Sequence, residues 1–303
     1  MKLLKRSAPP PYDEHLTYFT LTQADELRRL VARSFAAVGR DVDVYPDRIE
    51  DRGGTTFGLW NIGALCAGAD ASEWPQLIDD HVQLVATPAR ALGDVTAAEL
   101  ASGLRLRLVG AGYVPDPDSL GYARLVAPGL LEVLTVDLGD AVATPSREEL
   151  NGRGTIARLV ERGRDNLRAL LDGGAVRAHT VGQEGRGAFT AVRGESLFTA
   201  SLALLLPETM ARLTGDEDWG RGALVAVPSR HELLYRPIDA SDARIALGDM
   251  HHVTLLGLDG EVGRLSPDVF WVRRQSWVQL TSSVGGKPRI LRGTGFREAL
   301  AGL

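Results

Sequence analysis

Several features that mark specialised classes of protein are scarce or missing in this chain. Its 303 residues include one cysteine, Cys66, which excludes an internal disulfide and a zinc site made of thiolates. No apolar run approaches the ~18 residues that a transmembrane helix needs, and the first residues lack the apolar core of a signal peptide. We therefore expect a cytoplasmic protein without membrane association, stabilised by its hydrophobic core.

Lysine is equally scarce, and the charge balance argues against nucleic acid as a partner. Only three of the 34 basic residues are lysines, and the arginines are scattered rather than clustered with aromatic residues. The formal net charge is −5, so the protein as a whole does not attract a polyanion. With 44% hydrophobic and 24% charged residues, the composition is that of a globular protein.

Motifs for cofactors, metals and nucleophilic catalysis are also missing. His251-His252 is the closest pair of histidines, and two neighbours in a strand would point to opposite faces instead of binding one ion. Gly110-Ala111-Gly112 precedes Pro115, which prevents the helix that a dinucleotide-binding loop requires. No serine lies in a Gly-x-Ser-x-Gly elbow. We therefore expect no cofactor and no metal, and we assign no catalytic residue.

Predicted helices and strands alternate along the chain. Their order predicts an α+β fold of two or three packed lobes, in which helices cover antiparallel sheets. Residues 1–20 read as a disordered or extended segment. A first lobe of helix, strand, strand and helix occupies residues 21–93, a second lobe occupies residues 94–173, and a third lobe with C-terminal strands occupies residues 174–303.

Local signals place some of the element boundaries. Thr96 and Ser146 each stand three residues before a glutamate, which is the capping-box pattern that begins a helix. In the first lobe, residues 55–65 read as a strand. In the third lobe, residues 242–247 read as a short helix, and the apolar run at residues 253–258 reads as a separate strand.

A cluster of polar residues follows directly after a wholly apolar predicted strand. Residues 223–227 contain only alanine, leucine and valine, and Pro228 prevents further pairing of that strand. Ser229, Arg230 and His231 follow at once. The cluster is either a strand exit, in which Arg230 bridges to a neighbouring acid, or a ligand- or partner-binding site at the edge of a sheet.

Two other segments carry residues with both a structural and a functional explanation. Asn166 has weak helix propensity but lies inside a predicted helix near Arg168, and Asp137 ends a predicted strand. These side chains either fix the helix and strand to their neighbours or contribute to a polar site. Trp271, Arg273 and Trp277 form a late segment that either packs a strand onto the sheet or serves as a docking surface, because tryptophan and arginine are favoured at interface centres.

The ordered set of these segments resembles a bacterial protein family. An apolar strand ending in Val136-Asp137, a helix that carries Asn166-Leu167 and a strand that continues as Val227-Pro228-Ser229-Arg230 are similar to the YtpQ-like family over residues 22–278. The chain departs from that family in its arginine-rich composition, its proline-rich start and its tail after Val278. The resemblance implies a cytoplasmic bacterial α+β protein, and it implies no activity, cofactor or catalytic residue.

Two hypotheses about function follow. The leading one is a non-enzymatic module, similar to a chaperone, adaptor or immunity protein, that binds another protein or a peptide, because antiparallel sheets offer edges to a partner strand. The alternative is a small-molecule enzyme or sensor for an anionic ligand, with a site near Arg230, His231 and Arg168. The sequence favours binding over catalysis.

Overall fold

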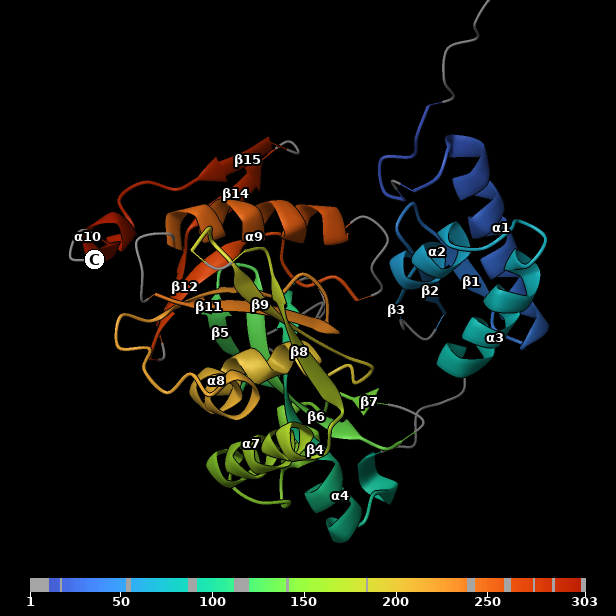
Figure 1. Cartoon of the computed structure of the whole chain (residues 1–303). Coiled ribbons are helices and arrows are strands. Elements are labelled where there is room, and N and C mark those ends of the chain that lie inside the picture. Colours follow the sequence, from blue (N-terminus) through green and yellow to red (C-terminus); the bar gives the residue numbers. More distant parts are fainter. Residues whose placement is uncertain are drawn as a thin grey trace, which may run out of the picture. The chain divides into compact units, whose positions relative to one another are not determined.

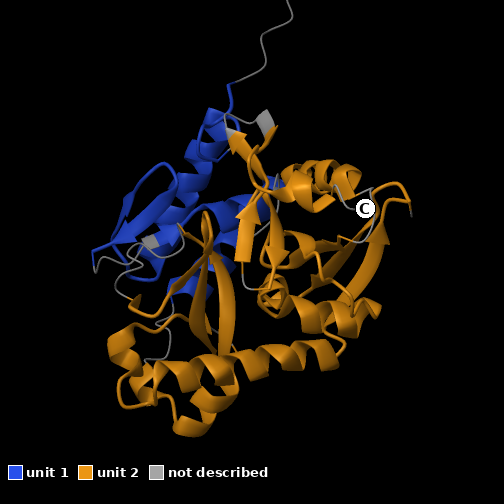
Figure 2. Ribbon diagram, turned by 90° about the vertical axis from the view of Figure 1, so that its left-hand side faces the viewer, with its two compact units in different colours: residues 1–88, 259–262 blue, residues 89–258, 263–303 orange. Residues whose placement is uncertain are grey.

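The computed structural model describes residues 11–16, 18–52, 56–86, 92–111, 120–139, 142–183, 185–238, 243–258, 263–274, 276–284 and 287–300. Helices pack on several antiparallel sheets (Figure 1), which confirms the predicted α+β fold class. The chain divides into two compact units, which Figure 2 colours separately; the first comprises residues 1–88 and 259–262, and the second comprises residues 89–258 and 263–303.

The first unit consists of a three-stranded antiparallel sheet and three helices. Its elements are α1 (Leu21–Ala37), β1 (Val42–Val44), β2 (Arg48–Asp51), β3 (Thr56–Gly58), α2 (Trp60–Ala67) and α3 (Trp74–Ala86), with the strands in the order β1-β2-β3. Thr20 and Gln23 form a capping box at the start of α1. From there Leu27, Val31 and Phe35 enter the core of the unit at helical spacing.

The predicted strand at residues 55–65 is wrong beyond Gly58. Trp60–Ala67 is helix α2, and its buried residues Ile62, Gly63 and Cys66, together with Leu59 before it, recur at the spacing of one helical face. A short apolar run fits a buried strand and a buried helix equally well by hydrophobicity alone. Packing against α3 decided between them, and Trp74 of α3 donates a 2.8 Å hydrogen bond from Nε1 to the carbonyl of Cys66.

The segment before α1 also differs from the prediction. Residues 1–10 lie outside the described part of the chain, whereas residues 11–16 and 18–20 are packed into the first unit. Leu16 and Phe19 are buried, and the carboxylate of Asp13 accepts a 2.7 Å hydrogen bond from the amide of Leu16. Asp13 also pairs with Arg28 of α1 at 2.9 Å. The segment is ordered because it covers the apolar side of α1.

Cys66 provides a direct test of this packing. Burial raises the pKa of its thiol to about 11, and the thiolate is the species that reacts. At pH near 8 we expect native Cys66 to react with Ellman's reagent at least about a hundred times more slowly than an unhindered thiol of ordinary pKa. Urea that unfolds the first unit should restore the ordinary rate. Fast labelling of the native chain would contradict the packing of α2.

The second unit contains two larger antiparallel sheets. The first has the order β4-β6-β5, with β7 beside β6, and the second has the order β13-β12-β10-β11-β9-β8. The strands are β4 (Leu104–Gly110), β5 (Arg124–Ala127), β6 (Leu130–Asp137), β7 (Val142–Ala143), β8 (Val176–Val181), β9 (Phe189–Gly194), β10 (Ala223–Ala226), β11 (Glu232–Pro237), β12 (Val269–Arg273) and β13 (Ser276–Gln279). A separate hairpin pairs β14 (Thr281–Val284) with β15 (Lys287–Ile290).

Helices cover these sheets. They are η1 (Leu92–Asp94), α4 (Ala97–Gly103), α6 (Arg147–Leu150), α7 (Ile156–Asp172), η3 (Thr199–Leu205), α8 (Leu206–Thr214), α9 (Ala243–Leu258) and α10 (Phe296–Leu300). The predicted capping boxes at Thr96 and Ser146 are confirmed, since each side chain accepts a hydrogen bond from the amide of the glutamate three residues later.

One hydrophobic core joins the two sheets of the second unit. Leu106 and Leu134 from the four-stranded sheet belong to the same buried cluster as Val225 and Tyr235 from the six-stranded sheet. The predicted lobes 94–173 and 174–303 thus contribute to a shared core. The opposite face of the six-stranded sheet is covered by α9 and α10.

Helix α9 replaces the predicted short helix and following strand. It runs without interruption through residues 253–258. Its buried residues recur at intervals of three and four positions and are Ala243, Ala246, Leu247, Met250, His251 and Thr254. The β-branched residues Val253 and Thr254 favour a strand locally, but burial of this continuous face against the six-stranded sheet overrides that preference.

Candidate functional site

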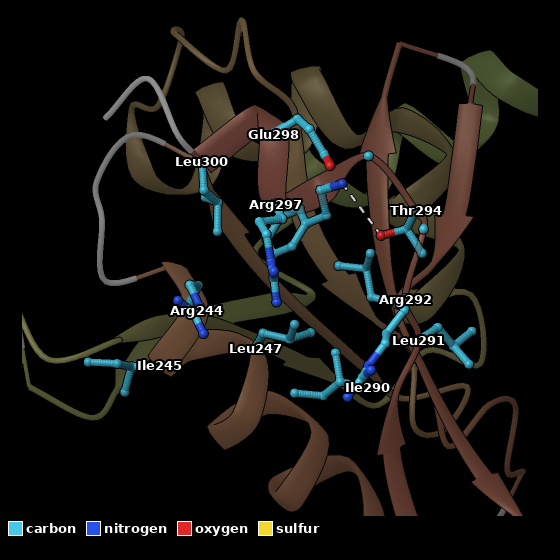
Figure 3. Close-up of a pocket in the computed structure, with 14 residues that line it drawn as sticks. Arg244, Ile245, Leu247, Ile290, Leu291, Arg292, Thr294, Arg297, Glu298 and Leu300 are labelled. Atoms are coloured by element: carbon cyan, nitrogen blue, oxygen red, sulfur yellow. Dashed lines mark hydrogen bonds between the residues drawn. The ribbon is translucent and has the colours of Figure 1, made fainter.

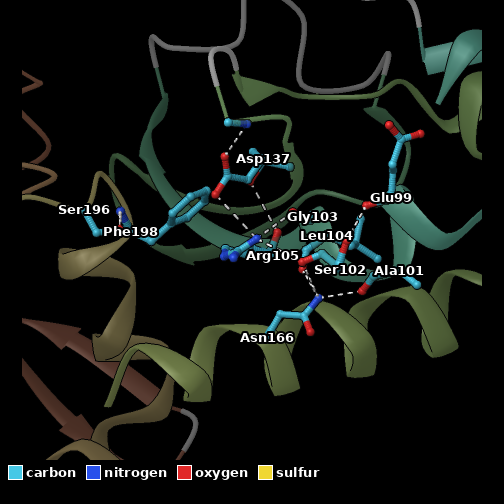
Figure 4. A network of polar contacts seen from close by, with 12 residues as sticks. Glu99, Ala101, Ser102, Gly103, Leu104, Arg105, Asp137, Asn166, Ser196 and Phe198 are labelled. Carbon is cyan, nitrogen blue, oxygen red and sulfur yellow. Dashed lines mark hydrogen bonds and ion pairs between the residues drawn. The ribbon is translucent and has the colours of Figure 1, made fainter. Parts of the chain in front are cut away.

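Asn166 joins the middle of α7 to the turn between α4 and β4. Its Nδ2 donates to the carbonyl oxygens of Ala101 at 2.8 Å and Leu104 at 2.7 Å, with a third contact of 3.3 Å to Ser102 (Figure 4). The carbonyls at the C-terminal end of a helix lack partners within that helix. Asn166 therefore satisfies the end of α4, and this contact explains an asparagine inside a helix.

Asp137 holds the same turn from the other side. Its carboxylate lies 3.5 Å from Nη1 of Arg105, which also donates to the carbonyl of Gly103 at 3.0 Å. The carboxylate of Asp137 also accepts a 3.1 Å hydrogen bond from the amide of Gly139. Figure 4 shows Asp137 and Asn166 on opposite sides of the backbone of residues 101–105. The two residues thus share a structural task at one turn.

Ser229, Arg230 and His231 are held by one another and by the end of β9. Ser229 is fully buried and its hydroxyl accepts from the amide of His231 at 3.3 Å. Nε of Arg230 donates to Nε2 of His231 at 2.9 Å, so Nε2 is the unprotonated nitrogen of the ring. Nδ1 then carries the hydrogen that faces the carbonyl of Gly194, 3.2 Å away. These contacts fix the exit of β10 to β9.

Arg168 makes a different set of contacts from those of Arg230 and His231. Its guanidinium pairs with Asp165 at 2.6 Å and with Glu208 at 3.3 Å, and it joins α7 to α8. Of the three residues of the small-molecule hypothesis, Arg168 is thus engaged by carboxylates, Arg230 by the imidazole of His231, and His231 by the carbonyl of Gly194. The structure does not bring Arg168 together with the other two.

The late tryptophans pack inward, and the exposed Arg273 lies over one of them. Trp271 is buried, and its Nε1 donates to the carbonyl of Arg221 at 2.9 Å. Its ring contacts Phe296 of α10 edge-on at a centroid distance of 5.7 Å, and the guanidinium of Arg273 lies over the ring, 4.8 Å from its centroid. Trp277 lies against Phe270, also at 5.7 Å. Trp271 thereby supports the helix that follows the C-terminal hairpin.

That C-terminal region forms a cavity which the sequence did not predict. The cavity has a volume of about 940 Å³ and lies between the first turns of α9 and the segment from the end of β15 to α10 (Figure 3). Its lining consists of Arg244, Ile245, Leu247, Leu280, Ile290, Leu291, Arg292, Gly293, Thr294, Gly295, Phe296, Arg297, Glu298 and Leu300.

Apolar side chains form the floor and part of the rim of this C-terminal cavity. Leu247, Leu280 and Phe296 are buried beneath it and belong to the core cluster under α9. At the rim, Ile245 and Ile290 are 52% and 62% exposed. Exposed aliphatic side chains beside a concave surface are typical of a binding site.

The charged residues of the cavity are mainly arginines. Arg244, Arg292 and Arg297 line it together with one acid, Glu298, so the lining side chains carry a net charge of +2 in a chain whose net charge is −5. Within the described part of the chain, none of these three guanidinium groups forms a hydrogen bond or ion pair with the protein. Figure 3 shows Arg297 extending from α10 toward the start of α9, where Arg244 lies.

Most of this site could not be found by local signals. Arg292 stands next to the pair Ile290-Leu291, and this mixture of aliphatic and basic residues was the available clue. Arg244 lies 48 positions earlier, on helix α9, which extends well beyond the predicted helix at residues 242–247. Only the packing of α9 beside the C-terminal segment brings the two together.

The described residues contain neither a metal-ligand cluster nor a membrane-spanning helix. No group of three or more histidine, cysteine or acidic side chains suited to a metal ion occurs among the residues that the structure describes. Within the same ranges, every helix is too short or too polar to span a bilayer. Searches with family models, among curated proteins and among solved structures gave no match to this chain.

Proposed function

We propose that this protein is a non-enzymatic binding protein whose C-terminal cavity takes an anionic ligand with an apolar part. The observation that carries the proposal is the group of three arginines, unpaired within the described chain, beside exposed aliphatic side chains. Guanidinium groups form strong, directional hydrogen bonds with carboxylate, sulfonate and phosphate groups. Their mutual repulsion is relieved when an anion binds between them.

The same lining supports binding rather than chemistry. It offers three guanidinium groups, hydrocarbon surface and the single carboxylate of Glu298, while the hydroxyl of Thr294 already accepts a hydrogen bond from the amide of Phe296 at 3.4 Å. We place this activity in the bacterial cytoplasm and retain the YtpQ-like family as the proposed relationship. The leading hypothesis of a protein- or peptide-binding module is therefore kept, with the C-terminal cavity in place of a sheet edge as its site.

The dye anilinonaphthalene sulfonate (ANS) tests the proposal, because it joins a sulfonate to an apolar aromatic group. We expect saturable binding of one dye per chain with enhanced fluorescence. Arg244→Gln and Arg297→Gln should each weaken the dye affinity about fivefold, since a charge-assisted hydrogen bond contributes ~1 kcal/mol at an exposed site. Fluorescence titration at low ionic strength measures the effect.

A matched control separates the cavity from the general charge of the protein. Arg158 on α7 is exposed and outside the cavity, so Arg158→Gln removes one positive charge without touching the proposed site. Its dye affinity should equal that of the original chain. Equal affinity in all variants, or unsaturable binding, would place the dye elsewhere and refute the proposal.

A further inference from the structure

Strand β8 is an open edge of the six-stranded sheet. It lies at one end of that sheet and pairs with β9 through six consecutive residue pairs without a shift of register (Figure 1). No described residue forms a hydrogen bond to the outer side of the β8 backbone. In an antiparallel pair, alternate residues turn their N–H and C=O groups away from the partner strand. β8 therefore presents a row of backbone donors and acceptors to any strand that approaches it.

Three other edge strands of the second unit are covered or irregular. β13, at the other end of the same sheet, contacts β5 of the four-stranded sheet, and β5 is interrupted by a shift of register. On β4, the amide of Leu108 donates to the hydroxyl of Ser201 at 2.9 Å, and the carbonyl of Leu104 accepts from Asn166 at 2.7 Å. Coverage and irregularity keep an edge from pairing with another chain. Among the described residues, nothing gives β8 such a cover.

The face of β8 toward α9 carries a positive charge that lacks a counter-charge. Arg177 and His179 are exposed on this face, which they share with Val181 of the core under α9. Arg177 lies directly opposite Arg193 of β9, and like charges in this position destabilise a sheet. Nε of Arg193 pairs with Oε1 of Glu232 at 2.6 Å, whereas Arg177 has no ion pair with a described residue. An acid on a strand added beyond β8 would neutralise Arg177 as Glu232 neutralises Arg193.

The opposite face of β8 is apolar. Val176 is buried there, and Ala178 packs against the shared core of the second unit while staying partly exposed. Leu206 and Met210 of α8 belong to the same core cluster. An aliphatic side chain placed beside Ala178 on an added strand would extend this core and leave water.

We propose that the edge of β8 binds an extended segment of another protein as a further strand of the sheet. The segment carries acidic side chains on the face of Arg177 and aliphatic side chains on the face of Ala178. Main-chain hydrogen bonds hold it, and the two faces select its sequence. The surface shares no residue with the C-terminal cavity, so this inference goes beyond the proposed function.

A short synthetic peptide tests the proposal with the full-length protein. Glutamate and valine alternate in a fluorescein-labelled peptide of about eight residues, whose binding is followed by fluorescence anisotropy. It should bind about tenfold more tightly than a peptide of the same composition with its glutamates and valines in two blocks, because only alternation places each kind of side chain on one face. Equal affinity for the two peptides would mean attraction by charge alone and would overturn the proposal.

Backbone methylation tests the strand pairing itself. A strand bound to one edge donates the N–H groups of alternate residues only. One labelled peptide is therefore N-methylated at its glutamates and a second at its valines. One of the two should lose binding and the other should keep it. The same loss in both, or no loss in either, would rule out the addition of a strand.

Arg177→Glu is the decisive variant. It replaces a like-charge pair with Arg193 by an opposite-charge pair at an exposed position, so folding should be retained. Affinity for the glutamate–valine peptide should fall about tenfold, and affinity for a lysine–valine peptide should rise by a similar factor. Arg158→Glu, on the exposed face of α7, makes the same change of charge and should alter either affinity by less than about twofold. Without this exchange of preference in Arg177→Glu, the proposed partner is refuted.

Two competing sites give different results. A peptide that displaces ANS and is weakened by Arg244→Gln would lie in the C-terminal cavity, which would overturn the site at β8 and leave the proposed function intact. Sedimentation velocity over a range of concentrations detects a second copy of the chain paired at β8. A monomer that binds one peptide is expected. A dimer that the peptide dissociates would show that the edge serves self-association, against a separate partner.

Discussion

Gly222→Ala is expected to lower the free energy of unfolding of the second unit by about 3 kcal/mol. Gly222 has φ of +92°, a conformation that side chains with a β-carbon rarely adopt. An added β-carbon would also overlap the carbonyl oxygen of Val272 and lie 2.8 Å from Nε1 of Trp271. The indole would have to leave the carbonyl of Arg221, so the support of Phe296 in the cavity floor would weaken too.

Urea unfolding followed by tryptophan fluorescence measures this loss, and Gly215 supplies the control. Gly215 ends α8 with φ of +76°, but a β-carbon there would meet nothing within 4 Å. Gly215→Ala therefore carries only the conformational cost, about 1 kcal/mol. An equal loss in both variants would show that the crowding at Gly222 contributes nothing. Weakened ANS binding in Gly222→Ala, below its unfolding midpoint, would connect Trp271 to the cavity.

Asn166→Asp should destabilise the second unit by about 2 kcal/mol at neutral pH. The substitution replaces a donor by a carboxylate that faces the carbonyl oxygens of Ala101, Ser102 and Leu104. It removes the hydrogen bonds that satisfy the end of α4 and adds repulsion between oxygens. Partial exposure of Asn166 to water limits the loss.

The Asn166→Asp effect should depend on pH. Nearby carbonyl oxygens disfavour the charged form, so the pKa of the new carboxyl in the folded chain should lie above its unfolded value of about 3.9. A group with a raised pKa in the folded state favours folding below its unfolded pKa and loses that contribution as pH rises through the folded pKa. The variant should therefore recover stability, relative to Asn166→Ala, as pH falls from 7 toward 4. Identical losses in the two variants at each pH would contradict the proposed geometry.

Local features of the fold could be predicted because neighbouring residues alone determine them. The capping boxes at Thr96 and Ser146 are contacts between residues three positions apart, and both are present. The apolar strand that ends before Pro228 is β10, which is buried on both faces. The predicted strand at residues 55–65 is wrong beyond Gly58, and the predicted strand at residues 253–258 is part of a helix. Their hydrophobicity suits either element, and only packing against α3 or the six-stranded sheet selects the helix.

For the candidate site residues too, the sequence predicts a local role, but the partners of each residue depend on tertiary packing. Asn166 and Asp137 are predicted either to fix their helix and strand to neighbouring segments or to contribute to a polar site, and their contacts with residues 101–105 are of the first kind. Their distance in sequence from that turn meant that the partner carbonyls could not be named in advance. Trp271 was recognised as either a packing or a docking residue, and its contacts with Arg221 and Phe296 are packing contacts.

The sequence by itself determined the α+β class, the lack of thiolate and glycine-rich nucleotide motifs, and the starts of several helices, because composition, periodicity and capping act over a few residues. The tertiary structure alone decided that Arg244 meets Arg292 and Arg297 at one cavity. It also left the aliphatic side chains of Ile245 and Ile290 exposed at the rim of that cavity. The contacts that create a binding surface join residues tens of positions apart, and no local preference specifies which distant segments pack together.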